Sequence, residues 1–304
     1  MIIGHDRIVK FFDNAIKNGG IGHAYCLVGS HGIGKRTLAN YISAQLLQTE
    51  ASKLHTNPDY YYLERATDEK TGKLKKEISV KQARDLRERL HSSSWLGAGQ
   101  AVIIDEAELL NTEASNALLK ILEEPPKKSI IFLLTTDDNL LLPTIRSRCQ
   151  TFYLSFVSDA EIGESLKTLG ADEHTAGEIV KMAWGRPGRA IEAFNDILVR
   201  QNYRDEITRV RNLISQPFYG KVAALEDLFG KKDEDHISKR DQWKAVLDIW
   251  QMEFRNILFG KSDWAKKFTQ TQIVTILDKI KLAQDLMGKN INPRLIIEEI
   301  LFKF

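Results

Sequence analysis

The sequence predicts an α/β fold, with an open parallel sheet in the first half of the chain and helices alone in the second. Continuous apolar runs at 24–28, 101–104 and 130–134 are typical of parallel strands buried on both faces. Helical patterns alternate with these runs up to about residue 154, as in βαβ units. Beyond residue 154, only helical patterns follow.

The α/β half is expected to begin with a strand at 24–28 and a helix at 35–47. A second strand at 60–63 and a polar helix at 80–90 come next, followed by the apolar strands at 101–104 and 130–134. The four strands make up the whole of the predicted sheet.

Between the last two strands, Asn111 is expected to cap a helix with Ala114, Leu118 and Ile121 on one face. The Pro125-Pro126 pair should end that helix. In the second half, short helices at 158–195 are interrupted at 185–188, and the charged stretch 231–235 is expected to be a solvated loop.

Composition and charge exclude several classes of protein. The 304 residues carry a net charge of only +2, which excludes an overall basic coat for nucleic acid. The apolar runs are far shorter than the ~20 residues that span a bilayer. Cys26 and Cys149 are the only cysteines in the sequence, so a disulfide framework and a four-cysteine zinc site are excluded. We expect a multi-domain cytoplasmic protein.

A nearly complete phosphate-binding loop follows the first strand and opens a helix. It reads Gly-Ser-His-Gly-Ile-Gly-Lys at 29–35, with Gly29, Gly32 and Gly34 for the turn and Lys35 for the outer phosphates. The motif requires Ser or Thr next, where a hydroxyl binds Mg²⁺. Here Arg36 occupies that position and Thr37 comes one residue late. A loop that retains the phosphate fold but has lost efficient hydrolysis is therefore a serious alternative.

Two acids end the strand at 101–104. In phosphate-loop NTPases the first acid, here Asp105, supports Mg²⁺, and the second, here Glu106, polarises the attacking water. Both lie where the carboxyl ends of parallel strands meet. They do not prove turnover, because such acids can persist in a subunit that only binds nucleotide.

Hydroxyls and arginines follow the strand at 130–134. Thr136 is placed to sense a γ-phosphate, although a turn at the strand end explains it equally well. The stretch Leu-Pro-Thr-Ile-Arg-Ser-Arg-Cys at 142–149 carries two arginines behind Pro143. An arginine there can direct its planar fork at phosphate charge in a neighbour's site, and a surface salt bridge is the plainer alternative.

Taken together, these motifs resemble the bacterial AAA+ sliding-clamp loaders of DNA polymerase III, and within them the delta-prime branch. The resemblance continues through Gly-Arg-Pro-Gly-Arg-Ala at 185–190 and covers nearly the whole chain. The matching segments are His-Ala-Tyr at 23–25, the loop at 29–35, Asp-Glu-Ala-Glu at 105–108, Asn-Ala-Leu-Leu-Lys-Ile-Leu-Glu-Glu-Pro-Pro at 116–126, the stretch at 142–149 and Asn-Pro-Arg-Leu at 292–295.

The resemblance implies an AAA+ domain at 1–156, a small helical lid at 157–199 and a helical collar at 200–304 that joins subunits into a ring. It further implies that Arg148 acts in trans at a neighbour's ATP site and that Arg189 lies in the second-sensor region. The implied partners are gamma or tau subunits, a delta subunit, the sliding clamp and, through the complex, primed DNA. The implied ligand is ATP, with Mg²⁺.

Two departures from the resembled family matter. Arg36 stands where hydrolysing gamma subunits keep Thr or Ser, which agrees with the degraded nucleotide site of a delta-prime stator. The zinc module of many relatives has no cysteines here, so zinc is not expected. One alternative is an autonomous ATPase, such as a gamma-like subunit or another AAA+ remodeller, and Lys35, Asp105 and Glu106 favour it. The other is a eukaryotic or archaeal clamp-loader small subunit.

Overall fold

The computed structural model describes residues 2–301, apart from 69, 73, 92–93, 127, 218, 222, 224–239, 263, 265–267 and 288–292. It contains two compact units: Met1–Leu169 with Gly185–Arg189, and Gly170–Trp184 with Ala190–Phe304. The expected loop at 231–235 and Asn292 lie outside the described residues. The three-domain division at 156/157 and 199/200 stays a prediction.

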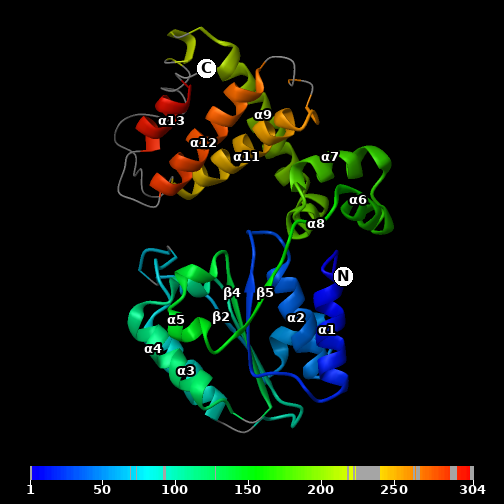
Figure 1. Cartoon of the computed structure of the whole chain (residues 1–304), viewed down its shortest axis with the longest axis vertical. Helices are drawn as coiled ribbons and strands as arrows, with labels where there is room; N and C mark the ends of the chain where they lie inside the picture. Colours follow the sequence, from blue (N-terminus) through cyan, green and yellow to red (C-terminus); the bar gives the residue numbers. More distant parts are fainter. Residues whose placement is uncertain are drawn as a thin grey trace. The chain divides into compact units, whose positions relative to one another are not determined.

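A five-stranded parallel sheet forms the centre of the first unit, in the order β2-β3-β4-β1-β5 (Figure 1). Because all strands run in one direction, their carboxyl ends lie along the same edge. The predicted α/β class and its four predicted strands are confirmed. The strands are β1 (Ala24–Val28), β2 (Tyr60–Leu63), β3 (Gln100–Ile104), β4 (Ser129–Thr135) and β5 (Gln150–Tyr153).

The sequence did not predict β5. It pairs only with β1, at the edge of the sheet, and its residues are exposed or half-buried. An edge strand needs no continuous apolar run, because one side and part of each face remain open to water. Gln-Thr-Phe-Tyr therefore lacks the signal that identified β1, β3 and β4.

Helices cover both faces of the sheet, and the alternation of strand side chains assigns each face its core. On one face, Tyr25 and Leu27 of β1 pack with Phe12 and Leu38. On the other, Cys26 packs among residues of the remaining helices. The helices are α1 (Asp6–Lys17) and α2 (Lys35–Leu46) on the first face, and α3 (Val80–His91), α4 (Thr112–Glu123) and α5 (Pro143–Arg146) on the second (Figure 1).

The predicted cap of α4 is confirmed. The Asn111 side-chain oxygen accepts a hydrogen bond from the Ala114 backbone N–H at 2.8 Å. The helix ends at Glu123, two residues before Pro125, which cannot continue it. Short 3₁₀ turns (Ala51–Thr56, Ala107–Leu109 and Asp138–Leu140) and α6 (Asp159–Thr168) complete the first unit.

All the regular secondary structure described in the second unit is helical. Trp243, Trp250 and Phe254 are buried in one core, and Trp264 packs against it half-buried, so packing accounts for these aromatic side chains. The helices are α7 (Glu173–Ala183), α8 (Pro187–Asn195), which begins in the first unit, α9 (Ile197–Ser215), α11 (Arg240–Leu258), α12 (Gln270–Met287) and α13 (Pro293–Leu301).

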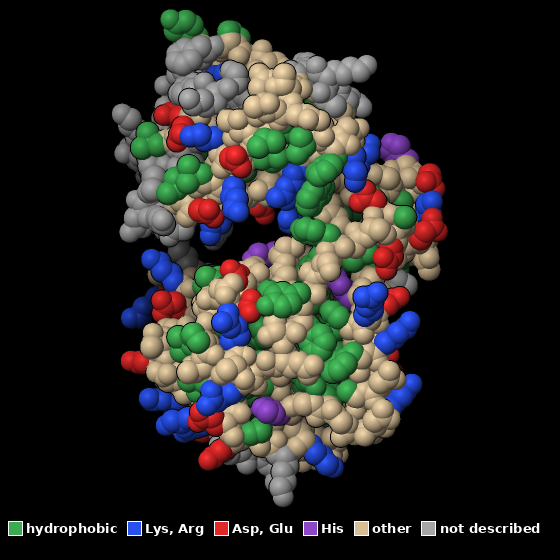
Figure 2. Space-filling view, in the orientation of Figure 1, with side chains coloured by type: hydrophobic (Ala, Val, Ile, Leu, Met, Phe, Trp, Pro, Cys, Tyr) green, Lys and Arg blue, Asp and Glu red, His purple; other side chains and the backbone are tan. Residues whose placement is uncertain are grey.

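The surface carries charges of both signs. On the face drawn in Figure 2, described acidic and basic side chains are interspersed over each unit, in keeping with the net charge of +2. Among the described residues, none of the helices combines the length and apolar character needed to cross a membrane.

Candidate functional site

The phosphate loop lies between β1 and α2, the context that the sequence predicted. Gly32 has φ +75° and Gly34 has φ +105°, values that side chains rarely tolerate. Gly34 precedes α2 and supplies no side-chain cap, so no side chain of this residue competes for the first N–H groups of the helix. The loop therefore has the backbone that a phosphate group requires.

Lys35 points back into this loop. Its ammonium group donates hydrogen bonds to the carbonyl oxygens of Gly29 and, at 3.2 Å, Ser30. Burial lowers the pKa of Lys35, while the charges of Glu108, Asp105 and Glu106 act in the opposite direction. The lysine therefore lies close to the acids at the end of β3, and its charge is partly balanced by them.

Both acids after β3 already have hydrogen-bond partners. The Tyr62 hydroxyl donates to Asp105 Oδ2 at 2.5 Å, and the Glu106 backbone N–H donates to Asp105 Oδ1 at 3.0 Å. The pKa of Tyr62 is raised by burial and by this carboxylate. Glu106 has φ 48°, and its carboxylate accepts from Arg65 Nε at 2.8 Å and Nη2 at 3.3 Å. The two acids are thus engaged within the chain.

Arg36 and Thr37 diverge from the start of α2. The Arg36 guanidinium lies over the Tyr62 ring, 4.1 Å from its centroid. This cation–π contact places Arg36 beside the tyrosine that binds Asp105. Thr37 lines a different cavity of about 460 Å³, together with Ile2 and Val9 of the N-terminal segment. Arg36 has no hydroxyl group, and Thr37 lines this other cavity, so neither residue replaces the missing magnesium ligand.

Thr136 is the residue just beyond β4. Its backbone N–H and hydroxyl donate to Glu108 Oε1 at 3.2 and 2.9 Å. The threonine therefore tethers the acidic turn after β3 to the next strand. This arrangement agrees with the strand-end interpretation and keeps Thr136 at the carboxyl edge of the sheet.

The start of α8 closes over the phosphate loop. The Gly188 N–H donates to the Gly32 carbonyl oxygen at 2.8 Å. A Cβ on Gly188 would lie 2.8 Å from that oxygen, so only glycine allows this approach. A Cβ on Gly32 would lie 3.4 Å from Arg189 Cβ and N, which places Arg189 directly against the loop.

Arg148 lies apart from this edge, after α5. One guanidinium nitrogen donates to Glu123 Oε1 of α4 at 2.8 Å, and the other donates to the Thr144 carbonyl oxygen at 3.0 Å. The side chains of Arg148 and Glu123 are 36% and 51% exposed. An ion pair of this exposure contributes ~0–1 kcal/mol and exchanges readily with other partners.

These residues fit the phosphate groups of a nucleotide but not its Mg²⁺ ion. The glycines, the open start of α2 and Lys35 match the chemistry of phosphate. The metal position has Arg36 in place of a hydroxyl, and its acids are bound to Tyr62 and Arg65. Within the part of the chain that the structure describes, no three His, Cys, Asp or Glu side chains are grouped so as to hold a metal. The absence of zinc stays a prediction.

Sequence reasoning gave no role to three residues of the site, Tyr62, Arg65 and Glu108, although Glu108 belongs to the matching segment at 105–108. Tyr62 lies beside Ile103 in the register of β2 and β3, so it reaches the acid two residues further along. The Tyr-Tyr-Tyr strand at 60–62 was the available signal, since three hydroxyls on one short strand are more than packing needs. No local sequence pattern indicated that Arg65 belongs to the site.

Comparisons with known proteins agree on one family. Residues 4–158 match the family described as DNA polymerase III, delta subunit. The Pseudomonas aeruginosa DNA polymerase III subunit delta' is 40% identical over 141 residues, 42% of this chain but only 41% of that protein. The Haemophilus influenzae subunit delta' is 30% identical over 263 residues, 80% of this chain and 73% of that protein.

The gamma branch and one solved structure are more distant. A Buchnera aphidicola DNA polymerase III subunit gamma is 27% identical over 81% of this chain and 69% of its own length. A gamma subunit-related protein of Thermotoga maritima has a TM-score of 0.52 at 20% identity, covering 96% of this chain and 97% of its own. That structure shares the fold, so the predicted α/β core followed by helices is confirmed.

Proposed function

Because this chain belongs to the DNA polymerase III delta' family, we propose that it is the stator-type subunit of a bacterial clamp loader. In this role it joins gamma or tau and delta subunits in the cytoplasm and helps load a sliding clamp on primed DNA. The chain itself binds nucleotide phosphate weakly or transiently and hydrolyses ATP very slowly.

One observation carries the proposal of slow hydrolysis: Arg36 stands in the magnesium-ligand position and stacks on Tyr62. A guanidinium there adds positive charge where Mg²⁺ would have to lie, which disfavours the metal. Tyr62 also holds Asp105, and Arg65 holds Glu106. A carboxylate bound to arginine is a poor acceptor for a proton from water.

Arg148 supports a role at a neighbour's site. It is half-exposed, it lies away from the phosphate loop of its own chain, and its surface ion pair with Glu123 costs little to exchange. A guanidinium that reaches the phosphates of an adjacent subunit would neutralise charge that develops there, an effect of about 10³–10⁵ in rate for arginine fingers.

The helical region at 200–304 is the proposed collar that joins the subunits, with a lid at 157–199. The described core of the collar is packed around Trp250 and Phe254, so subunit contacts would use the exposed faces of α9, α12 and α13. A truncation that ends near residue 197 should fail to co-purify with partner subunits. Entry of that truncation into a complete complex would contradict the collar assignment.

A gamma-like ATPase is the second candidate, because Lys35, Asp105 and Glu106 are all present at one edge of the sheet. Steady-state ATPase assays of the purified chain distinguish the two. Turnover near background, with co-purification of gamma and delta subunits, supports the stator. Turnover typical of an ATPase, abolished by Lys35→Ala, would identify the gamma-like enzyme instead.

A further inference from the structure

The first turn of α2, at the end of the phosphate loop, combines two cations with open backbone N–H groups. Lys35 and Arg36 are the first two residues of the helix, and its first turn contains no acidic side chain. The positive end of the helix dipole lies there, so two further positive charges are unfavourable unless an anion accompanies them. Among the described residues, no group accepts a hydrogen bond from the backbone N–H of Lys35, Arg36 or Thr37. This turn therefore favours a strongly negative ligand.

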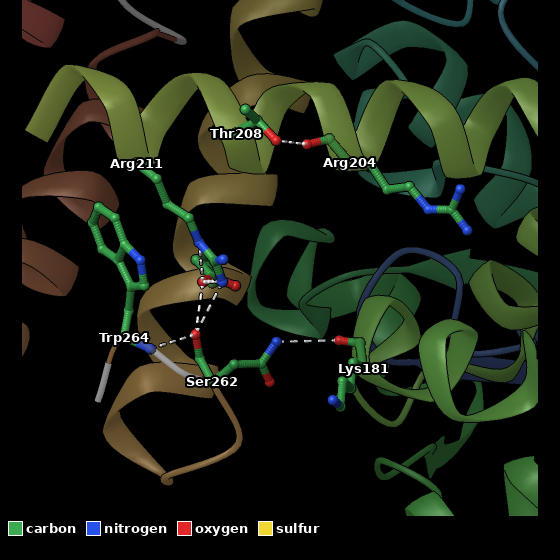
Figure 3. A network of polar contacts seen from close by, with 8 residues as sticks. Lys181, Arg204, Thr208, Arg211, Ser262 and Trp264 are labelled. Atoms are coloured by element: carbon green, nitrogen blue, oxygen red, sulfur yellow. Dashed lines mark hydrogen bonds and ion pairs between the residues drawn. The ribbon is translucent and has the colours of Figure 1, made fainter. Parts of the chain in front are cut away.

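The Arg36 side chain differs from arginines that are tied to a carboxylate. In a polar cavity of the second unit, Arg211 Nη2 donates to Glu253 Oε1 at 2.5 Å and to the Ser262 hydroxyl at 3.2 Å (Figure 3). Arg36 is exposed, and its guanidinium contacts the Tyr62 ring, 4.1 Å from the centroid. Within the part of the chain that the structure describes, no carboxylate accepts from Arg36. Its N–H donors therefore remain available to a ligand.

Arg36 occupies the place in the motif where Mg²⁺ normally balances phosphate charge. In the complete motif, the residue after the lysine is Ser or Thr and binds the metal, which bridges the outer phosphates. Tyr62 carries the Arg36 guanidinium on its ring and donates its hydroxyl to Asp105 at 2.5 Å. The guanidinium thus lies beside the acid that would bind the metal. Its positive charge and planar fork of N–H donors match phosphate oxygens.

The acids beside Lys35 limit how many phosphates the site accepts. The charges of Glu108 and Asp105 both act on the Lys35 ammonium group, so these carboxylates lie near the position of the outer phosphates. Without a metal ion between them, carboxylates and phosphate oxygens repel each other. This repulsion is larger for a nucleoside triphosphate, because its third phosphate adds negative charge on that side. A nucleoside diphosphate therefore fits the loop better.

We propose that the phosphate loop binds a nucleoside diphosphate without Mg²⁺, and that the Arg36 guanidinium leaves the Tyr62 ring to donate to its phosphates. The proposal rests on the proposed binding of nucleotide phosphate by this chain, and adds the ligand and its metal dependence. Mg²⁺ bound to the diphosphate would lie beside the guanidinium, so repulsion between the two cations weakens binding. A loop that keeps the hydroxyl has the opposite dependence, because its hydroxyl binds the metal together with the phosphates.

Calorimetric titration of the full chain with ADP tests the proposal. We expect ADP to bind more tightly in excess EDTA than in excess Mg²⁺, by up to about fivefold, the upper range for one exposed charge interaction. Lys35→Ala should abolish binding in both buffers, which assigns the signal to the phosphate loop. An affinity that is equal in the two buffers, or higher in Mg²⁺, would overturn the proposal. So would the absence of ADP binding in both buffers.

Two arginine variants show whether Arg36 causes this metal dependence. Arg36→Thr should weaken ADP binding in EDTA and restore the metal ligand, so the order of the two affinities should reverse. Arg84→Thr is the matched control, because Arg84 is an exposed arginine of α3, on the opposite face of the sheet from α2. It should keep the wild-type order. Both arginines are exposed, so neither substitution disturbs the core. An unchanged order in Arg36→Thr would contradict the role of Arg36.

A paramagnetic metal gives a second readout that does not depend on affinity. Mn²⁺ prefers the same oxygen ligands as Mg²⁺, and its electron paramagnetic resonance spectrum broadens when a protein immobilises it. With ADP, the wild-type chain should give no spectrum of protein-bound Mn²⁺, whereas Arg36→Thr should give one. A protein-bound Mn²⁺ spectrum from the wild-type chain with ADP would overturn the proposal.

This proposal and the proposed function can fail separately. Metal-free ADP binding by a chain that does not co-purify with gamma or delta subunits would retain the role of Arg36 and reject the stator. Assembly of a complete complex by a chain that binds no ADP in either buffer would retain the stator and reject the diphosphate site.

Discussion

The carboxyl edge of the sheet in the first unit and the polar cavity in the second unit both gather charged side chains, but they pair them differently. At the sheet edge, Lys35, Asp105 and Glu106 each have a partner from the same chain. In the cavity between α7, α9, α11 and the residues after α11, Arg204 pairs with Glu178 and Arg211 pairs with Glu253. Presence of a motif and availability for a ligand are therefore separate properties.

The difference follows from burial and distance. The acids at the sheet edge lie within reach of Tyr62 and Arg65, which bring their own donors. In the cavity, Asn256 Nδ2 donates to the Lys181 carbonyl oxygen, and Asn256 Oδ1 is buried. A recognisable sequence motif identifies the sheet edge, whereas no motif in the helical sequence indicates the charged pairs of the cavity.

The largest expected effect concerns Arg148. Arg148→Ala should lower DNA- and clamp-stimulated ATP turnover at the neighbouring site of a reconstituted complex by about 10³-fold or more, because the finger's charge is lost. Steady-state ATPase and thermal melting measure activity and stability side by side. Arg146→Ala is the matched control, because it removes an exposed hydrogen bond to Asn139 and an ion pair with Asp138 two residues before Arg148. Full ATPase activity of a well-assembled Arg148→Ala complex would contradict the proposed role of Arg148 as an arginine finger.

Restoring the hydroxyl ligand for Mg²⁺ and freeing an acid at the sheet edge should increase ATP hydrolysis. The double variant Arg36→Thr with Arg65→Ala supplies the hydroxyl and releases Glu106, so ATP hydrolysis by the isolated chain should rise about 10²-fold, the lower range for a positioned base. Single-turnover hydrolysis of radiolabelled ATP measures the gain. Adding Lys35→Ala should abolish it. No gain with intact folding would show that the partners of the acids do not limit hydrolysis.

A third test measures what a buried hydrogen bond contributes to the stability of the second unit. Glu206, 6% exposed, accepts from the Trp250 indole N–H at 2.9 Å in the second unit. Trp250→Phe removes this donor and leaves space, so the free energy of unfolding should fall by about 2–3 kcal/mol. Denaturant titration measures the change, and the half-buried Trp264→Phe should cost less. An equal loss of unfolding free energy in the two variants would mean that the hydrogen bond from Trp250 to Glu206 does not contribute measurably to stability.

The smallest effect is the pH dependence of the Glu178–Arg204 pair. Arg204 lowers the pKa of Glu178, so the ionised carboxyl group stabilises the folded chain at neutral pH. This contribution is lost as the pH falls from about 4.3, the ordinary glutamate value, through the lowered folded value. Comparing the melting temperature of wild type and Glu178→Gln from pH 6 to pH 3 should show a difference below about 2 °C that disappears in acid. A melting-temperature difference that stays constant from pH 6 to pH 3 would show that ionisation of Glu178 does not stabilise the folded chain.

Sequence reasoning captured most of the first unit because its signals are local. Four strands, the cap at Asn111 and the phosphate loop each depend on a few consecutive residues. The edge strand β5 was missed, since its Gln-Thr-Phe-Tyr sequence lacks a buried apolar run. The aromatic residues Trp243, Trp250 and Phe254 of the second half pack in one core, and the sequence did not indicate the cavity beside it.

The sequence by itself determined where the loop, the acids and Arg148 lie along the chain, and that Arg36 replaces the hydroxyl. Only the tertiary structure decided their partners. Tyr62 meets Asp105 across 43 residues and Arg65 meets Glu106 across 41, because the register of β2 against β3 brings them together. Local chemistry is written in consecutive residues, whereas pairing between distant side chains depends on how strands and helices pack.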